Sequence, residues 1–310
     1  MKTNISLILI LCLLLGACKN GNASSQSKSE TPQDTIKAIK MPAIPQMMTA
    51  PEQRADFLAK HYWDNVNFAD TNYIHHPEVT EQAWADYCDL LNHVPLETAQ
   101  QAMRNVIDRT NVDKKVFTYI TDLADKYLYD PNSPMRNEEF YIPVLEAMIA
   151  SPVLNETEKI RPQARLKLAQ KNRIGTKALN FTYTLASGAQ GSLYQLKAEY
   201  LLLFINNPGC QACTETIEGL KNAPIINQLL QEKKLVLLSI YPDEELDEWK
   251  KHLSEFPNEW INGYDKKFTI KEEQVYDLKA IPTLYLLDKD KTVLLKDATA
   301  PAIEAYLMQH

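Results

Sequence analysis

Two cysteines separated by two residues, Cys210 and Cys213, restrict this chain more than any other feature. The apolar run before them, residues 200–205, predicts a buried strand, and the sequence after Cys213 has a helical pattern. An Asn-Asn-Pro-Gly turn, residues 206–209, joins the two elements. Thiols three positions apart at a helix start can form a disulfide, and the helix N-terminus favours a thiolate on the first. The pattern predicts a redox-active dithiol that performs thiol–disulfide exchange.

The first 17 residues are predicted to be a signal peptide. Lys2 precedes an apolar stretch at residues 5–15, which is shorter than the roughly 20 residues of a membrane span but typical of a signal peptide. The stretch ends in Leu-Gly-Ala-Cys, which resembles a bacterial lipobox, and this resemblance implies a lipid on Cys18. We therefore expect a protein of the cell envelope, anchored by that lipid and facing the periplasm. The alternative is an ordinary signal peptide followed by an unmodified Cys18.

Three cysteines remain beyond the N-terminal segment: Cys88, Cys210 and Cys213. An exported compartment permits disulfides, and an odd number divides naturally into one pair and one spare thiol. Cys88 shares one face of a predicted helix with Trp84 and Leu91. We expect Cys88 to be buried and inert, the alternative being a resolving or regulatory thiol.

The rest of the chain divides by pattern into a tether and two domains. Residues 18–48 are polar and lack an apolar period, which predicts a flexible tether. Residues 49–170 repeat the i, i+3, i+4 pattern between prolines and predict a helical domain of five or six helices. Its first helix is expected to begin with a capping box formed by Thr49 and Glu52.

Residues 171–310 change to strands alternating with helices. The expected strands are 181–185, 192–196, 200–205, 235–241, 283–287 and 292–295, and the expected helices are one running to about residue 231, one over 244–254 and one from about residue 301. A looser stretch is expected up to residue 274. This order predicts an α/β domain with a mixed central sheet flanked by helices. The fold class is thus an all-α domain followed by an α/β domain.

The order of dithiol, strand, helix and Ile281-Pro282-Thr283 resembles the thioredoxin fold. The long segment between Cys213 and Pro282 is similar to that of the membrane-tethered, thioredoxin-like envelope reductases. The resemblance covers residues 175–310. It implies a thioredoxin-like thiol–disulfide oxidoreductase that acts on protein thiols and disulfides.

The same resemblance implies roles for individual residues. Cys210 matches the attacking cysteine, and Cys213 matches the resolving cysteine that releases a mixed disulfide. Pro282 matches a cis-proline that faces the dithiol and forms the substrate groove with Ile281 and Thr283. A cis bond before proline costs little, so the assignment is physically reasonable. The alternative is a trans Pro282 that opens an edge strand.

Three positions depart from the thioredoxin pattern. Gly209 stands where thioredoxins usually carry Trp, and Phe204 stands where the preceding strand usually carries an acid. Thr216 replaces a Glu found in some tethered reductases. Gln211-Ala212, between the cysteines, matches neither strong reductants nor strong oxidants. The direction of exchange therefore stays open.

Other functional classes receive less support. A net charge of −7 without a basic run argues against a nucleic-acid binder. No second CxxC motif supplies a zinc set, so no metal is expected. No nucleotide or flavin motif is present, so no cofactor is expected and electrons would come from a partner protein. The alternative function is a non-catalytic envelope lipoprotein, a binding or scaffold module, whose CxxC forms a structural disulfide.

The helical domain carries its own resemblance. Residues 61–64 (HYWD) and 129–138 are similar to an uncharacterised helical domain found ahead of thioredoxin-like domains in envelope lipoproteins of the Bacteroides group. We hypothesise that the domain presents substrates or partners, or shields the dithiol. The polar connector 133–139 is interpreted as a surface loop, with a contact to the C-terminal domain as the alternative. The acidic run 243–248 is interpreted as matching a helix dipole.

Overall fold

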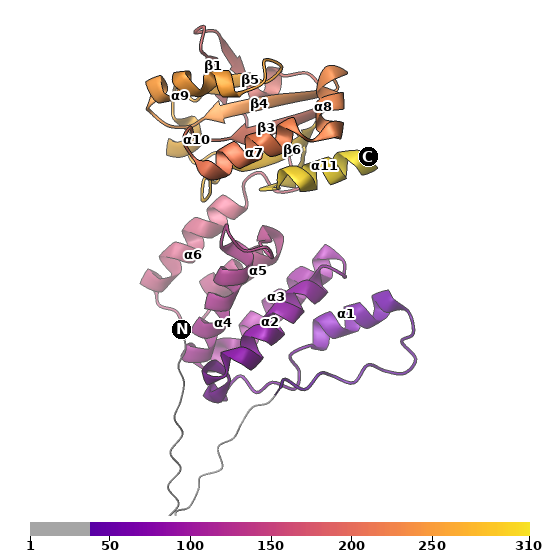
Figure 1. The fold of residues 1–310 in the computed structure, drawn as a ribbon. Coiled ribbons are helices and arrows are strands. Elements are labelled where there is room, and N and C mark those ends of the chain that lie inside the picture. The colour runs from indigo at the N-terminus through magenta and orange to yellow at the C-terminus, as the bar shows by residue number, and fades with distance from the viewer. Residues whose placement is uncertain (1–37) are drawn as a thin grey trace, which may run out of the picture. The chain divides into compact units, whose positions relative to one another are not determined.

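The computed structural model describes residues 38–310, so the predicted signal peptide, Cys18 and most of the tether lie outside the described residues (Figure 1). The N-terminal part contains α1 (Pro51–His61), α2 (Pro77–Leu91), α3 (Leu96–Arg109), α4 (Lys114–Ala124), α5 (Glu138–Ala150) and α6 (Glu156–Ala169), with the short turns η1 (Thr71–His75), η2 (Thr110–Val112) and η3 (Asp125–Tyr129). The expected helical domain is confirmed. None of the helices in residues 38–310 is both long and apolar enough to cross a membrane.

Side-chain caps define several helix starts, but not the one predicted at Thr49. Asn155 forms a capping box with Glu158 at the start of α6, and Asp113 accepts two backbone hydrogen bonds at the start of α4. Helix α1 instead has Ala50 as its N-cap, with no capping side chain. The predicted capping box is therefore wrong. Proline at the first helical position has the φ angle that a helix requires, so α1 can begin without that cap.

The core of the helical domain contains most of its large aromatic side chains. Trp84, Cys88 and Leu91 face this core together, as their spacing in α2 predicted. The side chain of Cys88 is 2% exposed, and burial raises the pKa of its thiol. Cys88 is therefore a packed, protonated thiol, as expected of an inert cysteine.

The C-terminal part is a seven-stranded mixed sheet with the strand order β2-β1-β5-β4-β3-β6-β7. The strands are β1 (Thr182–Leu185), β2 (Gln190–Ser192), β3 (Tyr200–Ile205), β4 (Leu235–Tyr241), β5 (Ile261–Tyr264), β6 (Thr283–Asp288) and β7 (Val293–Lys296). The helices are α7 (Gln211–Lys221), α8 (Pro224–Gln231), α9 (Leu246–His252), α10 (Thr269–Glu272) and α11 (Ala300–Gln309), with the turns η4 (Leu193–Gln195) and η5 (Leu253–Glu255). The predicted α/β class with a mixed sheet flanked by helices is confirmed.

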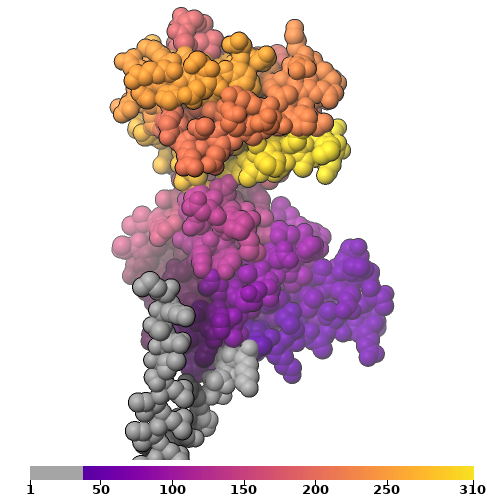
Figure 2. Space-filling view, viewed as in Figure 1, coloured from indigo at the N-terminus to yellow at the C-terminus, as the bar shows by residue number. Residues whose placement is uncertain are grey.

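Strand β3 lies in the middle of this sheet and is buried on both faces. Leu202 and Phe204 point to the face covered by α7, α8 and α11, and Leu203 and Ile205 point to the opposite face, which α10 helps to cover. Figure 2 shows α7, α8 and α11 on the same side of the protein. Strand β3 pairs in parallel with β4 and antiparallel with β6. An apolar run buried on both faces is typical of such a central strand.

Three predicted elements differ in the structure. The expected return strand 192–196 lies earlier in the chain, as β2, which pairs with β1 and ends at Ser192; residues 193–195 form the 3-10 helix η4, in which Leu193 is fully buried. The helix expected to run to residue 231 is two helices, divided at Pro224, which has no N–H for a continuous helix. The stretch expected to be loose contains β5, which pairs with β4 and β1.

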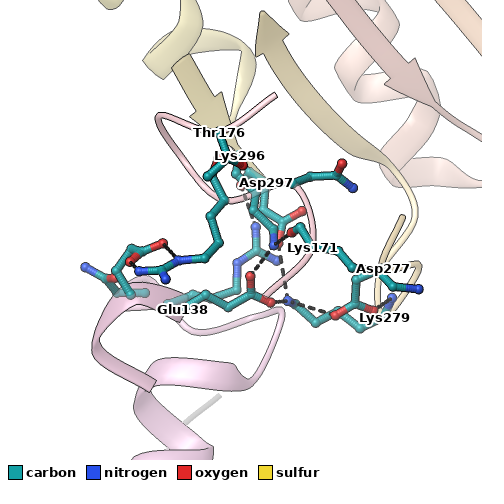
Figure 3. A network of polar contacts seen from close by, with 12 residues as sticks. Glu138, Lys171, Thr176, Asp277, Lys279, Lys296 and Asp297 are labelled. Carbon is teal, nitrogen blue, oxygen red and sulfur yellow. Dashed lines mark hydrogen bonds and ion pairs between the residues drawn. The ribbon is translucent and has the colours of Figure 1, made fainter. Parts of the chain in front are cut away.

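Residues of the connector 133–139 contact the C-terminal part, so their interpretation as a surface loop is wrong. An Arg136 N–H donates to the backbone carbonyl of Asp297 at 2.5 Å. Glu138, the first residue of α5, is buried between Lys279 and Lys296, each 2.5 Å from one of its carboxylate oxygens (Figure 3). This contact links residues more than 140 positions apart in the sequence.

The Glu138 contact belongs to a larger buried ion cluster. The ammonium of Lys279 also lies 3.3 Å from the carboxylates of Asp277 and Asp297. All five side chains are less than a tenth exposed. Burial opposes the charge on Glu138, but the two neighbouring ammonium groups outweigh this effect and lower its pKa. The carboxylate is therefore ionised in the folded protein at neutral pH.

We predict that Glu138→Gln lowers the free energy of unfolding at pH 7 by about 3 kcal/mol, since it removes the carboxylate that pairs with both buried lysines, Lys279 and Lys296. Because the folded pKa of Glu138 lies below its ordinary value of 4.5, the unfolded chain binds the proton first as pH falls. The wild type therefore loses this stabilisation below about pH 4.5, and the two proteins converge. Urea unfolding from pH 7 to pH 3 measures the difference.

The matched control is Glu259→Gln, which makes the same charge change at an exposed position. Its free energy of unfolding should follow the wild type across the same pH range. A Glu138→Gln protein whose deficit stays constant between pH 7 and pH 3 would contradict the prediction.

Candidate active site

The cysteine pair lies at the end of β3, where a tight turn passes into α7. Asn206 follows the strand and is buried, and its side-chain amide donates to the hydroxyl of Ser239 on β4 at 2.8 Å. Gly209 has a φ angle of 74°, which is unfavourable for residues with a Cβ. Cys210 is then the N-cap of α7, with Gln211 as the first helical residue. The turn residues thus place the first thiol directly at the helix N-terminus.

The two thiols have different surroundings. Cys210 is half-buried, whereas Cys213, in the first turn of α7, is 2% exposed. The backbone N–H of Cys213 donates to Cys210 Sγ at 3.3 Å, so a helix donor points at the first sulfur. Burial raises the pKa of Cys213. Both cysteines are thiols in this structure.

The peptide bond between Ile281 and Pro282 is cis, as the resemblance implied. The carbonyl oxygen of Ile281 lies 3.7 Å from Cys210 Sγ. Thr283, the first residue of β6, pairs directly with Ile205, the last residue of β3. This register explains why Cys210 and Ile281, 71 positions apart, meet: the residues after one strand and before the other must lie at the same end of the sheet. The structure therefore brings the predicted site residues of both segments together.

The strand position at which thioredoxins usually carry an acid lies in the apolar core of this protein. Phe204 is fully buried and packs edge-to-face with Trp260. A different carboxylate reaches the cysteine loop: Asp243 accepts hydrogen bonds from the side chains of Asn207 at 2.8 Å and Lys271 at 2.9 Å. The sequence interpretation of Asp243 as part of a helix N-terminus is wrong, because α9 begins only at Leu246. Asp247 and Glu248 do lie in its first turn.

Topology could have identified Asp243 before the structure. The residue follows β4, the parallel neighbour of β3, and loops after parallel neighbours lie at the same edge of a sheet. Asn207 lies at that edge after β3. No sequence pattern connects Lys271 with them, because its approach depends on the fold of the segment between β5 and β6.

A cleft of about 370 Å³ adjoins the cysteine loop. Its lining includes the apolar side chains Leu168, Ile270, Leu278 and Ile281 and the polar side chains Asp243 and Lys271. Leu168 comes from α6, so the helical domain supplies part of one wall. The cleft and the dithiol share Ile281, whose carbonyl contacts Cys210.

Comparison with known proteins agrees with this architecture. Residues 17–172 match a family model described as a domain of unknown function (DUF5106), and residues 198–293 match a model described as thioredoxin-like. A crystal structure of a thioredoxin-like protein from Bacteroides caccae is 84% identical, with a TM-score of 0.87; the match covers 89% of this chain and all of that one. The chain belongs to the thioredoxin-like proteins that carry a DUF5106 domain.

Two further structures match less than half of this thioredoxin-like protein. The C-terminal domain of an uncharacterised protein from Bacteroides fragilis is 69% identical over 44% of this chain and 98% of that one, with a TM-score of 0.44. A domain of a possible thiol-disulfide isomerase from Cytophaga hutchinsonii is 25% identical over 45% of this chain and 94% of that one, with a TM-score of 0.38. No curated protein matches the chain.

The different burial of its cysteines predicts an order of alkylation for the thioredoxin-like protein. With iodoacetamide at pH 8, we expect Cys210 to react first, Cys213 at least tenfold more slowly and Cys88 only after unfolding. Burial limits access and also raises the pKa of both slower thiols. Peptide mass spectrometry after timed quenching measures the three rates. In the control reaction in urea, all three cysteines should be labelled at equal rates. Labelling of Cys213 faster than Cys210 in the native protein would contradict the prediction.

Proposed function

We propose that this protein is a thiol–disulfide oxidoreductase that exchanges disulfides with protein substrates through Cys210 and Cys213. The observation that carries the proposal is the position of Cys210: half-buried, at a helix N-terminus, and 3.7 Å from the carbonyl of the residue before a cis-proline. A sulfur so placed is accessible to a substrate and receives a helix N–H bond. Membership of the thioredoxin-like proteins supports the same chemistry.

The reaction follows from the unequal burial of the two thiols. Cys210 loses its proton and attacks one sulfur of a substrate disulfide, forming a mixed disulfide and releasing the other substrate sulfur as a thiol. Cys213 then attacks Cys210 Sγ, and the second substrate thiol leaves. The dithiol has lost two electrons and two protons, and the substrate disulfide has become two thiols. A partner protein with its own dithiol would return the electrons, and the reverse sequence would oxidise a substrate.

The Ile281–Thr283 segment is proposed to bind the substrate beside the dithiol. Pro282 has no N–H, so a backbone donor to an extended peptide in this segment would have to come from Ile281 or Thr283. The Ile281 carbonyl already lies next to the sulfur, and Thr283 is fixed by a 2.7 Å hydrogen bond from its hydroxyl to the Ala280 carbonyl. Ile281 also lines the adjoining cleft, where the chain of the substrate could continue.

The competing function is a binding or scaffold module with a structural disulfide. A structural disulfide is usually buried at both sulfurs and strongly resistant to reduction. Cys210 is half-buried and faces the cis-proline segment rather than a closed core. These observations favour exchange over a structural role.

Cys213→Ala tests the proposal directly. Without the second thiol the mixed disulfide on Cys210 cannot resolve, so covalent complexes with protein substrates should accumulate. They should run above the monomer on non-reducing gels and disappear on reduction, and mass spectrometry should identify the attached chains. The double variant Cys210→Ala/Cys213→Ala is the matched control and should give none. If complexes are absent from the single variant as well, exchange through Cys210 is wrong.

We propose that the protein works in the cell envelope, anchored through a lipid on Cys18 and facing the periplasm. The lipobox-like Leu-Gly-Ala-Cys after an apolar stretch supports this location, and the polar residues 19–48 would form the tether. Multiple acyl chains would hold the protein stably on a membrane.

Cys18→Ser tests this anchor. The variant should move from the membrane fraction to the soluble fraction of fractionated cells, because its only proposed lipid site is gone. Cys88→Ser is the matched control and should stay with the membranes. Equal distributions of the wild type and Cys18→Ser would rule out the lipid anchor.

A further inference from the structure

The structure assigns the helical domain a role in positioning the site: through Glu138, it holds the segment 273–282, the cis-proline loop, against Cys210. This inference rests on the proposed exchange reaction and names Glu138 as its positioning residue. The loop runs from the end of α10 to the cis bond before β6. It therefore carries the Ile281 carbonyl that contacts Cys210.

Glu138 holds the second half of this loop. Its carboxylate binds the Lys279 ammonium at 2.5 Å, two residues before Ile281 (Figure 3). The second carboxylate oxygen pairs with Lys296 on β7, so Glu138 lies between the loop and the sheet. Asp277 completes the arrangement, because its carboxylate accepts the backbone N–H of Lys279 at 3.0 Å. The charged groups fix both the side chain and the backbone of the loop near residue 279.

The first half of the loop is held by the residues that follow α6. The Lys171 ammonium donates to the backbone carbonyls of Glu273 and Gln274 at 3.2 and 2.6 Å. The buried side chain of Asn172 donates to the Val275 carbonyl at 2.7 Å. Three consecutive carbonyls of the loop thus accept hydrogen bonds from the two residues that connect α6 to the C-terminal part.

Leu168 of α6 also reaches the neighbourhood of this loop. It lines the same cleft as Leu278 and Ile281 of the cis-proline loop. Residue 168 lies in the last turn of α6, residues 171 and 172 directly follow that helix, and residue 138 begins α5. The two helices pack against each other, so a shift of either helix would be transmitted to the loop.

The loop reaches the dithiol through Ile281. The Cys210 thiol can donate its proton to the Ile281 carbonyl at 3.7 Å, and the Thr283 hydroxyl fixes the neighbouring Ala280 carbonyl. This thiol contact exists only in the reduced protein, because a disulfide sulfur has no proton. Holding the carbonyl in place therefore stabilises the dithiol relative to the disulfide. Releasing the loop should shift the equilibrium toward the disulfide and make the protein a stronger reductant.

The experiment measures the dithiol–disulfide equilibrium in mixtures of reduced and oxidised dithiothreitol, using the protein without its signal segment. One protein dithiol reduces one oxidised dithiothreitol and becomes a disulfide, so two electrons and two protons pass from the protein to dithiothreitol, and the reverse reaction returns them. For Glu138→Gln we expect the equilibrium constant to shift at least threefold toward the protein disulfide, or about 14 mV for two electrons. Thiol labelling and mass spectrometry measure the oxidised fraction.

The matched control is Glu139→Gln. Glu139 is the next residue of α5 and forms an ion pair with Arg173, but it does not contact the cis-proline loop. Its loss should leave the equilibrium constant within a factor of 1.5 of the wild type. Glu138→Asp keeps the negative charge and should restore at least half of the shift.

If Glu138→Gln does not fold, Lys171→Ala provides the same test from the other half of the loop, since it removes two hydrogen bonds from a partly exposed position. Folding is checked by circular dichroism. A folded Glu138→Gln, or Lys171→Ala in its place, with an unchanged equilibrium constant would overturn the positioning role. The equilibrium with dithiothreitol can be measured even if the CxxC disulfide is purely structural. It therefore tests the positioning role alone. The exchange reaction is tested separately, and it would be overturned if Cys213→Ala trapped no substrates.

Discussion

The pairing of β3 with β6 is the constraint on which the candidate site depends. Ile205 and Thr283 face each other across the antiparallel ladder. The cysteine loop leaves one strand at this pair, and the cis-proline loop enters the other strand at the same pair. Both strands are buried in the middle of the sheet, so a slip in register would also move a whole set of apolar side chains to the wrong face. The packing of the core therefore fixes the end of the sheet at which the cysteine loop and the cis-proline loop meet.

Much of this arrangement could be predicted from local sequence. The apolar run 200–205, the CxxC motif at a helix start and the Ile-Pro-Thr segment each carry a strong pattern, and each occurs where it was expected. The burial of Cys88 also followed from helical spacing. These features depend on neighbouring residues in the chain, where periodicity and turn chemistry are informative.

The predictions failed where a tertiary contact decides the structure. Glu138 belongs to a polar stretch, and its burial depends on two lysines more than 140 positions away. Asp243 lies in an acidic run, yet its partners come from the cysteine loop and from α10. Strand β5 is short and lacks a clear alternating pattern, so its pairing with β4 and β1 identifies it rather than its sequence. Polar residues gain their positions from partners that a single sequence does not reveal.

The burial of Cys88 has a consequence for how the chain matures. In an oxidising compartment, Cys88, Cys210 and Cys213 can form three different pairs, of which only one is the CxxC disulfide. Domains fold as units, and the N-terminal domain can fold while the rest of the chain is still emerging. Once α2 packs into the helical core, Cys88 is buried and cannot pair with Cys210 or Cys213. The order of the domains along the chain thus protects the correct pairing.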